Sequence, residues 1–373
     1  MIYNIKDVYT PAILVDLDVV EHNLHKYAAM AQQYGKQIWP MTKTHKSSEF
    51  LRMQKECGAS GCLCGTIDEC ETAAGMGMET VMYAYPVSTM TSISRLLRVA
   101  EKTRLILRID GAEAARQVDM AAAEHNQIID YTIIVDSGLH RFGVPAAEVV
   151  ELFHSLEEFS HLHFCGISTH PGHVYACKTP QEVPMYAQQE IQAVHTAYGL
   201  LREADIECEI VSSGSTPTFA PNLKDDILQI YHPGNYIFND CIQISTGTAA
   251  EEECALTILT SVISHPSEEL FLCDAGAKCL GLDKGAHGNT SLVGHGRILG
   301  HPELVVDSLS EEVGKIHVNG LTNLKVGDKI RIIPNHSCSS ANLTDYYVGV
   351  RGTKVERLVS VDIRGNKTTK GIE

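Results

Sequence analysis

The sequence has few basic residues and no long apolar run. Its 30 lysine and arginine residues are outnumbered by 46 aspartate and glutamate residues, giving a formal net charge of -16. This charge disfavours nucleic acid and anionic membrane surfaces as partners. The apolar runs are far too short to span a bilayer. The N-terminal stretch MIYNIKDVYTP lacks the basic and apolar regions of a secretory signal, so we expect a cytoplasmic protein.

The chain also lacks low-complexity segments, short repeats and linkers rich in proline, glycine or serine. Its 12 cysteines, without a secretory signal, are typical of reduced thiols rather than of a disulfide framework. Cys62 and Cys64 do not have zinc-ribbon spacing, so we interpret them as small core residues. A length of 373 residues with 44% hydrophobic content predicts a large barrel with a smaller domain, or two domains.

Short apolar β-type segments alternate with helical segments through the first two thirds of the chain. One predicted helix follows Asp18, which we expect to be its N-cap, and ends at Gly35. Eight strand-like segments alternating with helices predict a (β/α)8 TIM barrel, an α/β fold. The predicted strands are residues 37–43, 62–66, 80–84, 104–110, 131–136, 163–169, 207–213 and 227–231.

After about residue 240 the pattern changes to short β-type runs separated by glycine, proline and aspartate turns. This pattern predicts a C-terminal all-β domain. One further strand, residues 10–17, precedes the barrel and has no place among its eight strands. We therefore expect it to pair with the C-terminal strands. The predicted division is a barrel of residues 18–245 and a β-domain of residues 1–17 with 246–373.

Several polar segments follow predicted strands, where active sites of such barrels lie. Lys43 ends the first strand, and DSGLHRFG, STHPGHVY, SSGSTPT and YHPGNYIFND follow four others. The segment SSGSTPT offers hydroxyls and free backbone N–H groups, which suit a phosphate monoester. Alone, the lysine would be a solvated charge and the segment a plain loop. Together they suggest pyridoxal phosphate, which requires a Schiff-base lysine and a phosphate anchor.

His336 and Cys338 follow another predicted strand, KIRII. In an extended segment residues i and i+2 share a face, so both side chains could reach one ion. Imidazole with thiolate suits zinc, with water or substrate completing the coordination. On spacing alone, a buried cysteine beside a capping histidine is the more common arrangement.

Taken in order, the motifs resemble the metal-activated branch of the fold type III, alanine-racemase-like family of pyridoxal-phosphate enzymes. TPAILVDLD, KTHK, HPGNYIF and NHSCSSANL carry this resemblance, which covers nearly the whole chain. The branch contains D-threonine aldolases, eukaryotic-type D-serine dehydratases and D-threo-3-hydroxyaspartate dehydratases. The resemblance implies pyridoxal 5′-phosphate, Zn2+ or another divalent metal such as Mn2+, a small D-amino acid substrate and a homodimer.

The resemblance also implies roles for individual residues. Lys43 would carry the Schiff base and take the Cα proton, while His336 and Cys338 would hold the metal. Lys46 is expected to be a solvated charge that opens the next helix, and His45 either packs near the cofactor or is structural. The other matched positions are Arg141 near the cofactor ring, His170, Tyr175 and Tyr236 along the pocket, and Ser213, Gly214, Ser215, Gly234 and Asn235 around the phosphate.

The reaction is suggested by the residue at position 338. By this resemblance, the dehydratases of the branch have a His-x-Cys motif here, whereas the aldolases have a His-x-Asp motif. We therefore expect a lyase that eliminates the β-hydroxyl of D-serine or D-3-hydroxyaspartate, giving a 2-oxo acid and ammonia. The alternative is a D-threonine-type aldolase that gives glycine and an aldehyde.

Two further alternatives are an amino-acid racemase and a non-catalytic pyridoxal-phosphate carrier. A racemase could use Tyr346 or Tyr347 as its second base, but His336 and Cys338 would then be unexplained. The carriers resemble a bare barrel, whereas this chain has a β-domain. Departures from the branch pattern lie at Trp39 and Met41, in place of arginine and histidine, and at Val313, in place of a histidine. We therefore expect altered substrate contacts.

Overall fold

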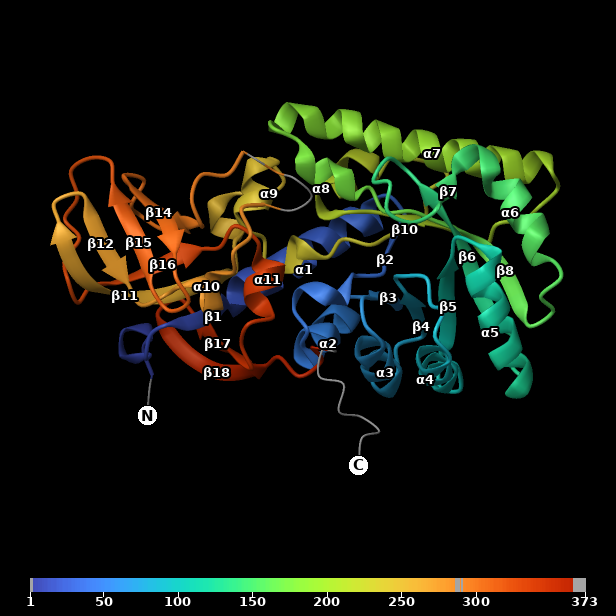
Figure 1. Cartoon of the computed structure of the whole chain (residues 1–373), viewed down its shortest axis with the longest axis horizontal. Coiled ribbons are helices and arrows are strands. Elements are labelled where there is room, and N and C mark those ends of the chain that lie inside the picture. Colours follow the sequence, from blue (N-terminus) through green and yellow to red (C-terminus); the bar gives the residue numbers. More distant parts are fainter. Residues whose placement is uncertain (1–2, 286–288, 290, 365–373) are drawn as a thin grey trace.

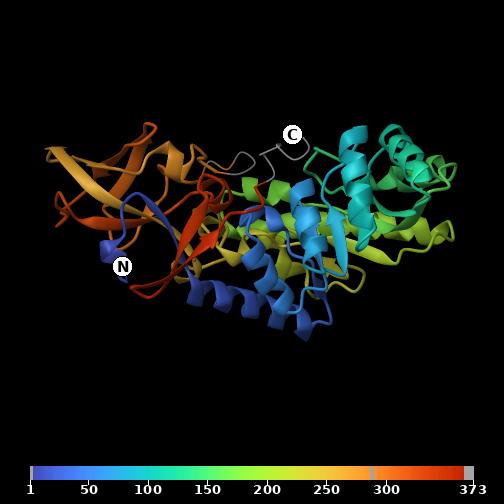
Figure 2. The ribbon, with the colours of Figure 1, turned by 90° about the horizontal axis from the view of Figure 1, so that it is seen from below.

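A computed structural model describes residues 3–285, 289 and 291–364 of the chain (Figure 1). The chain forms a helix-covered barrel, on the right of Figure 1, beside a β-rich part on the left. We call these the barrel and the β-domain. Helix α1 (Leu17–Gln33) runs along the junction between them and is seen at the lower edge of Figure 2. Within the described residues, no helix combines the length and apolar character needed to cross a membrane.

All eight predicted barrel strands are present, and they pair in parallel. Their order is β2-β10-β9-β8-β6-β5-β4-β3, and a bridge between Met41 and Leu63 joins the two ends into a nearly closed TIM-like barrel. The short strand β7 (Val144–Pro145) pairs with β6. The barrel strands are β2 (Gln37–Ile38), β3 (Gly61–Cys64), β4 (Thr80–Tyr83), β5 (Arg104–Ile109), β6 (Ile129–Asp136), β8 (Leu162–Ser168), β9 (Ile210–Ser213) and β10 (Ile230–Tyr231).

Helices follow the strands and cover the outside of the barrel (Figure 1). The prediction that Asp18 caps the first helix is wrong. Asp16 is the N-cap, because its carboxylate accepts hydrogen bonds from the backbone N–H groups of Asp18 and Val19. The remaining helices of this part are α2 (Ser48–Glu56), α3 (Ile67–Gly75), α4 (Met90–Ala100), α5 (Ala112–Glu124), α6 (Val149–Leu156), α7 (Val183–Glu203), α8 (Thr216–Asn222) and α9 (Cys241–Ser245).

The β-domain contains a mixed sheet in the order β14-β15-β12-β11-β1-β17-β18, with β16 beside β11 and β13 beside β16. Strand β1 (Ala12–Asp16) pairs antiparallel with β11 and parallel with β17, which confirms the pairing predicted for residues 10–17. Strands β13 and β14 were not predicted. The other elements are β11 (Leu256–Ser267), β12 (Leu270–Cys273), α10 (Ala277–Leu280), β13 (Arg297–Ile298), β14 (Leu304–Leu309), β15 (Gly314–Val318), β16 (Lys329–Ile333), α11 (Ser337–Ala341), β17 (Tyr346–Arg351) and β18 (Lys354–Ser360).

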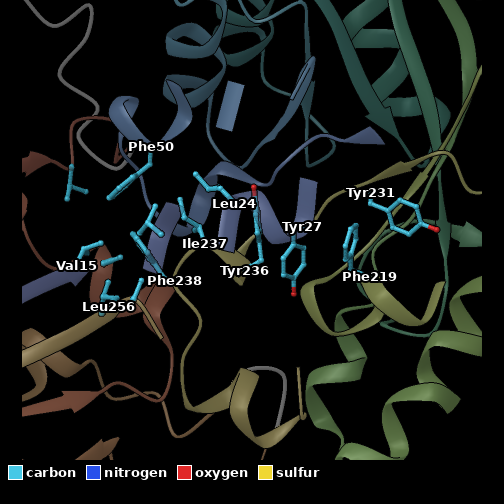
Figure 3. Packing of buried hydrophobic residues seen from close by; sticks show 14 of the residues in the cluster. Val15, Leu24, Tyr27, Phe50, Phe219, Tyr231, Tyr236, Ile237, Phe238 and Leu256 are labelled. Atoms are coloured by element: carbon cyan, nitrogen blue, oxygen red, sulfur yellow. The ribbon is translucent and has the colours of Figure 1, made fainter. Parts of the chain in front are cut away.

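One continuous core connects the two parts (Figure 3). On the barrel side, the Tyr27 ring stacks on Phe219 with centroids 4.8 Å apart. Towards the β-domain, Phe238 meets the edges of Phe50 and Tyr347 at 5.4 and 5.6 Å. Such aromatic contacts add to the free energy of burying the rings. The shared core therefore fixes the β-domain against the barrel rim.

Candidate active site

A cavity of about 630 Å³ lies where the carboxyl ends of the barrel strands face the β-domain. Its size is typical of pockets that bind small molecules. Most of the predicted site residues line it, although they come from segments far apart in the sequence. Those residues are Lys43, Arg141, His170, Tyr175, Ser215, Gly234 and Asn235 from the barrel, and His336 and Cys338 from the β-domain.

Lys43 reaches the cavity from a turn rather than from a strand end. Strand β2 ends at Ile38, and residues Thr42–Thr44 form the 3-10 turn η2. Beyond Ile38, single backbone bonds from Trp39 to Tyr231 and from Met41 to Pro233 continue the pairing up to η2. Gly234 allows a second loop to approach η2 closely: a Cβ there would lie 3.1 Å from Met41 Cβ and 3.2 Å from Thr44 Oγ1. The two loops therefore form adjoining parts of the cavity wall.

Lys46 is neither solvated nor the start of a helix, so that prediction is wrong. It is buried and forms an ion pair with the fully buried Glu69 of α3. Glu69 also accepts hydrogen bonds from Thr42 and from the backbone N–H of Gly65. The carboxylate thus holds both ends of the segment that carries Lys43. Helix α2 instead begins after Ser47.

His45 is structural, the second of its two predicted possibilities. Its ring is fully buried, with Nε2 3.2 Å from Gln54 Oε1 and Nδ1 accepting from the Ser47 N–H at 3.1 Å. Burial lowers the pKa of His45 to about 4, so the ring is neutral at neutral pH.

Ser213, Gly214 and Tyr236 do not line the cavity, in contrast to their predicted neighbours. The Ser213 hydroxyl turns away to donate to Glu190 on α7. Gly214 has a φ of +138°, and a Cβ there would lie 2.9 Å from the backbone nitrogen of His232, so the position favours glycine. Tyr236 points into the core, where its ring lies 4.7 Å from that of Tyr27 (Figure 3).

Glu190 supports the loop that contains Ser215. It is fully buried and accepts hydrogen bonds from Ser213 and Asn222. Burial raises the pKa of Glu190 to about 7, although hydrogen bonds from Ser213, Thr218 and Asn222 oppose the rise. The native protein therefore retains a proton on Glu190 between about pH 4.5 and 7, where the unfolded chain has lost it.

The proton on Glu190 makes the free energy of unfolding depend on pH. The contribution of Glu190 is present in full below pH 4.5 and is lost as pH rises through about 7, a change of at most about 3 kcal/mol. We expect Glu190→Gln to remove this contribution. The free energy of unfolding of the wild type should therefore fall relative to that of the variant as pH rises from 5 to 8. Thermal unfolding of both proteins across this range measures the difference. Parallel pH profiles would contradict the prediction.

Two buried nitrogens at the cavity wall were not predicted. Arg108, on β5, donates to Ser168 Oγ at 2.8 Å and to the Ala84 carbonyl at 3.2 Å, but its buried Nη2 has no partner among the described residues. The buried Nε2 of His232 also has none. Buried polar atoms are rarely left without a partner. Both atoms therefore fit a wall that contacts a polar ligand. An arginine within the apolar run RLILRI was the available sequence signal for Arg108.

His170 contacts the loop that contains Ser215. Its Nδ1 donates to the carbonyl of Gly214 at 3.1 Å, which leaves Nε2 as the nitrogen without a proton. Burial, with the nearby charge of Lys43, holds the pKa of His170 well below its usual range. The cavity is therefore lined by a neutral imidazole at this position.

His336 and Cys338 lie in a helix start, not on one extended strand. Strand β16 ends at Ile333, His336 is the N-cap of α11, and Cys338 lies in the first turn of that helix. The predicted extended geometry is therefore wrong, but both side chains still reach the cavity. The Sγ atom of Cys338 is 3.3 Å from the Thr44 hydroxyl, which places it beside the turn that carries Lys43.

Charges around this pair favour a protonated imidazole beside a thiolate. Burial opposes both charges. The charge of His336, together with its hydrogen bond, nevertheless lowers the pKa of Cys338, and Lys43 adds to this effect. In turn, Cys338 and Asp283 raise the pKa of His336 to about 10. Asp283 accepts a hydrogen bond from His336 Nδ1 at 3.2 Å.

The donor set at this corner fits a divalent metal in part. Imidazole and thiolate are zinc ligands, and a carboxylate that holds the other ring nitrogen is the usual support of a ligating histidine. Within the described part of the chain, however, no group of three or more His, Cys, Asp and Glu residues could hold a metal ion. A metal bound here would therefore need water or substrate to complete its coordination.

Residues 15–240 match the family described as alanine racemase, N-terminal domain, and residues 255–350 match the putative serine dehydratase domain. The chain is 29% identical to 3-hydroxy-D-aspartate aldolase from Paracoccus denitrificans, over 96% of this chain and 93% of that protein. It is also 29% identical to D-serine dehydratase from Dictyostelium discoideum, over 92% of this chain and 94% of that protein.

A solved structure is similar over nearly the whole chain. D-threo-3-hydroxyaspartate dehydratase from Delftia sp. HT23 superposes with a TM-score of 0.88 at 26% identity, covering 96% of this chain and 98% of that one. Two variants of this enzyme have also been solved. One replaces a histidine by alanine, and the other replaces a cysteine two positions later and is in the metal-free form.

Proposed function

The chain belongs to the alanine racemase N-terminal domain family, here joined to a serine dehydratase domain, and on this premise we propose a pyridoxal-phosphate- and zinc-dependent lyase. Its substrates would be D-β-hydroxy-α-amino acids such as D-serine or D-3-hydroxyaspartate. The products would be a 2-oxo acid and ammonia. The relatives include both dehydratases and aldolases, so the choice of reaction rests on the residues of this chain.

The observation that carries this proposal is the position of His336 and Cys338 in the same cavity as Lys43. The contact between Cys338 and Thr44 brings a candidate metal ligand next to the residue that follows Lys43 in the chain. A cysteine also stands two residues after a histidine in the solved dehydratase whose cysteine variant is metal-free. This likeness supports the dehydratase over the aldolase.

The cavity wall fits pyridoxal phosphate. Lys43 would hold the cofactor, and Ser215, Gly234 and Asn235 would surround its phosphate. The unpartnered Nη2 of Arg108 and Nε2 of His232 offer polar contacts for a bound group. When bound, the cofactor supplies an electron sink for charge that develops at Cα. Lys43 would take the Cα proton at Nζ.

His336 and Cys338 would hold the metal, with Asp283 orienting the imidazole. A metal ion at this corner would act as a Lewis acid towards the β-hydroxyl, which makes hydroxide a better leaving group. The two parts of the chain would thus act at neighbouring carbons of the substrate. Lys43, from the barrel, would act at Cα, and the His336–Cys338 pair, from the β-domain, would act at the substituent on Cβ. Both groups are needed for elimination.

The aldolase remains the second candidate because 3-hydroxy-D-aspartate aldolase is among the similar proteins. The racemase is less well supported. Tyr347 is fully buried and its hydroxyl donates to the His45 carbonyl at 2.6 Å, while Tyr346 is half exposed, and neither lines the cavity of this chain. A homodimer is part of the proposal, since it follows from the family resemblance.

Product analysis tests the proposal. The cofactor-loaded protein would be incubated with D-serine, D-3-hydroxyaspartate and D-threonine, with and without a chelator, while 2-oxo acid and glycine are quantified. We expect 2-oxo acid that is lost on chelation and restored by zinc. Glycine with an aldehyde would support the aldolase instead. Accumulation of the L-enantiomer alone would overturn both in favour of a racemase.

The charge of the wall favours an acidic substrate. Lys43, Arg108 and Arg141 line the cavity, whereas no aspartate or glutamate occurs among its described lining residues. Lys46 and Arg364 also line it but are paired with Glu69 and Asp345. A cleft lined by one sign of charge concentrates ligands of the opposite sign. This arrangement supports D-3-hydroxyaspartate, which has a second carboxylate.

Arg364 lies at the cavity wall, where its guanidinium would bind that second carboxylate. Its Nη1 donates to the carbonyl of Asn342, the residue that follows α11, on the side of the cavity that carries Cys338, and its Nη2 forms an ion pair with the exposed Asp345 that a substrate carboxylate would replace. Hydrogen bonds to charged groups contribute about 1.5–3 kcal/mol, so Arg364→Gln should lower kcat/KM for D-3-hydroxyaspartate by roughly 10- to 100-fold. The value for D-serine should change little. Arg364→Lys keeps the charge and should retain part of the preference, whereas equal losses on both substrates would contradict this role.

A further inference from the structure

A buried carboxylate connects the two proposed binding regions. Asp240 is the N-cap of α9 and is fully buried. One of its oxygens accepts from the backbone N–H of Gln243 at 3.0 Å, and the other accepts from the side-chain amide of Asn235 and, at 2.8 Å, from the backbone N–H of Ser337. Asn235 belongs to the proposed phosphate site, and Ser337 lies between His336 and Cys338.

A second contact closes this connection. The Ser337 hydroxyl donates to the side-chain carbonyl of Asn235 at 2.7 Å, so both polar groups of Ser337 that face the barrel are held. The backbone N–H of Asn235 in turn donates to the Thr216 hydroxyl at 3.1 Å, next to Ser215. All three residues, Asn235, Asp240 and Ser337, are buried. We call them the Asp240 bridge.

We propose that the Asp240 bridge couples the binding of pyridoxal phosphate to the binding of the metal ion, with Asp240 as a positioning residue. This inference rests on the proposed function. A phosphate held at Asn235 fixes one end of the bridge, and a metal held by His336 and Cys338 fixes the other. The second ligand then meets a turn that is already ordered and binds more tightly. Buried hydrogen bonds transmit such an effect well, because no water is present to replace a displaced partner.

The proposed coupling requires equal changes in two binding affinities. If the metal raises the affinity for the cofactor by a given factor, the cofactor must raise the affinity for the metal by the same factor. Typical couplings are about 5- to 150-fold, and we expect a factor of roughly ten here. Neither group needs to contact the other for this effect, because each contacts its own end of the Asp240 bridge.

Asp240→Ala should break the coupling. Two N–H donors, from Asn235 and Ser337, converge on one oxygen of Asp240, and alanine offers them no acceptor. Ser337→Ala is the milder variant. It keeps the backbone bond to Asp240 but removes the bond to Asn235, so its coupling should be reduced rather than lost.

The experiment uses the full-length protein freed of metal and cofactor. Pyridoxal phosphate would be titrated with and without saturating Zn2+, and Zn2+ with and without saturating pyridoxal phosphate, by following cofactor absorbance and by equilibrium dialysis. In wild type we expect the same factor, roughly ten, in both directions. In Asp240→Ala we expect a factor near one.

Two variants separate coupling from simple weakening of one site. Glu190→Gln should weaken cofactor binding, since the carboxyl group of Glu190 holds Ser213, Thr218 and Asn222 and does not contact the Asp240 bridge. Asp283→Asn should weaken metal binding, since the carboxylate of Asp283 holds His336 and Ser339. Both should keep the wild-type coupling factor. Failure of either ligand to bind wild type would contradict the proposed function, whereas independent binding of both would overturn the coupling alone.

Discussion

Replacing Lys43 by alanine is expected to reduce turnover by roughly 10³-fold or more, because one change removes both the group that holds the cofactor and the base at Cα. Lys43 lies in the wall of the cavity, next to Thr44, which contacts Cys338. Its loss should also abolish covalent trapping of the cofactor on the chain by borohydride. Initial rates and mass spectrometry of the reduced, digested protein measure the two effects.

Lys46→Gln is the matched control for this experiment. Lys46 is the other lysine of the KTHK motif and also lines the cavity, but its ammonium group is paired with Glu69. Loss of one partner of a buried ion pair typically costs about 3–5 kcal/mol, so the variant should be less stable. Borohydride should still trap the cofactor on Lys43. Trapping on Lys46 in the wild type, or full activity of Lys43→Ala, would contradict the assignment.

The second large effect is expected for Cys338→Ser. A Lewis acid contributes several kcal/mol to stabilising charge in the transition state, so loss of the metal should lower the rate of elimination by about 10³-fold. The variant should contain less zinc after dialysis but should still allow the cofactor to be trapped on Lys43 when the cofactor is saturating. Zinc content and the rate of 2-oxo acid formation measure the prediction.

Cys279→Ser serves as the control for the thiol. Cys279 is half-buried on α10, and it does not line the cavity. It should retain wild-type zinc content and activity. If instead Cys338→Ser remained fully active in the presence of a chelator, the metal would have no role in the reaction, and Cys338 would be a buried thiol that only packs against η2.

The barrel could be predicted from the sequence because its strands are short apolar runs between helices, a pattern that depends only on local residues. Strand β1 could be predicted to pair with the β-domain because an eight-stranded barrel has no place for it. The same reasoning missed β14, whose run LVVDSL includes Asp307 and Ser308. The strand boundary near Lys43 was also wrong, since the turn η2 places Lys43 outside the strand.

The site was less predictable wherever a distant residue decides what a side chain does. Lys46 looked solvated because Glu69, its partner, is 23 residues away in the sequence. Tyr236 and Ser213 belong to matched motifs, but the core around Tyr27 and the carboxylate of Glu190 draw their side chains away from the cavity. The local sequence around Asp240 indicates at most a helix N-cap, because the partner that links it to the β-domain, Ser337, is 97 residues away.

Anomalous diffraction tests the central claim most directly, namely that Lys43 and the His336–Cys338 pair serve one reaction centre. Crystals of the active, cofactor-bound protein would be measured at the zinc absorption edge. We expect a peak about 2.3 Å from Cys338 Sγ and about 2.0–2.1 Å from a nitrogen of His336, in the same cavity as cofactor density that is continuous with Lys43. A zinc peak elsewhere in the protein, or cofactor density that does not reach Lys43, would contradict it.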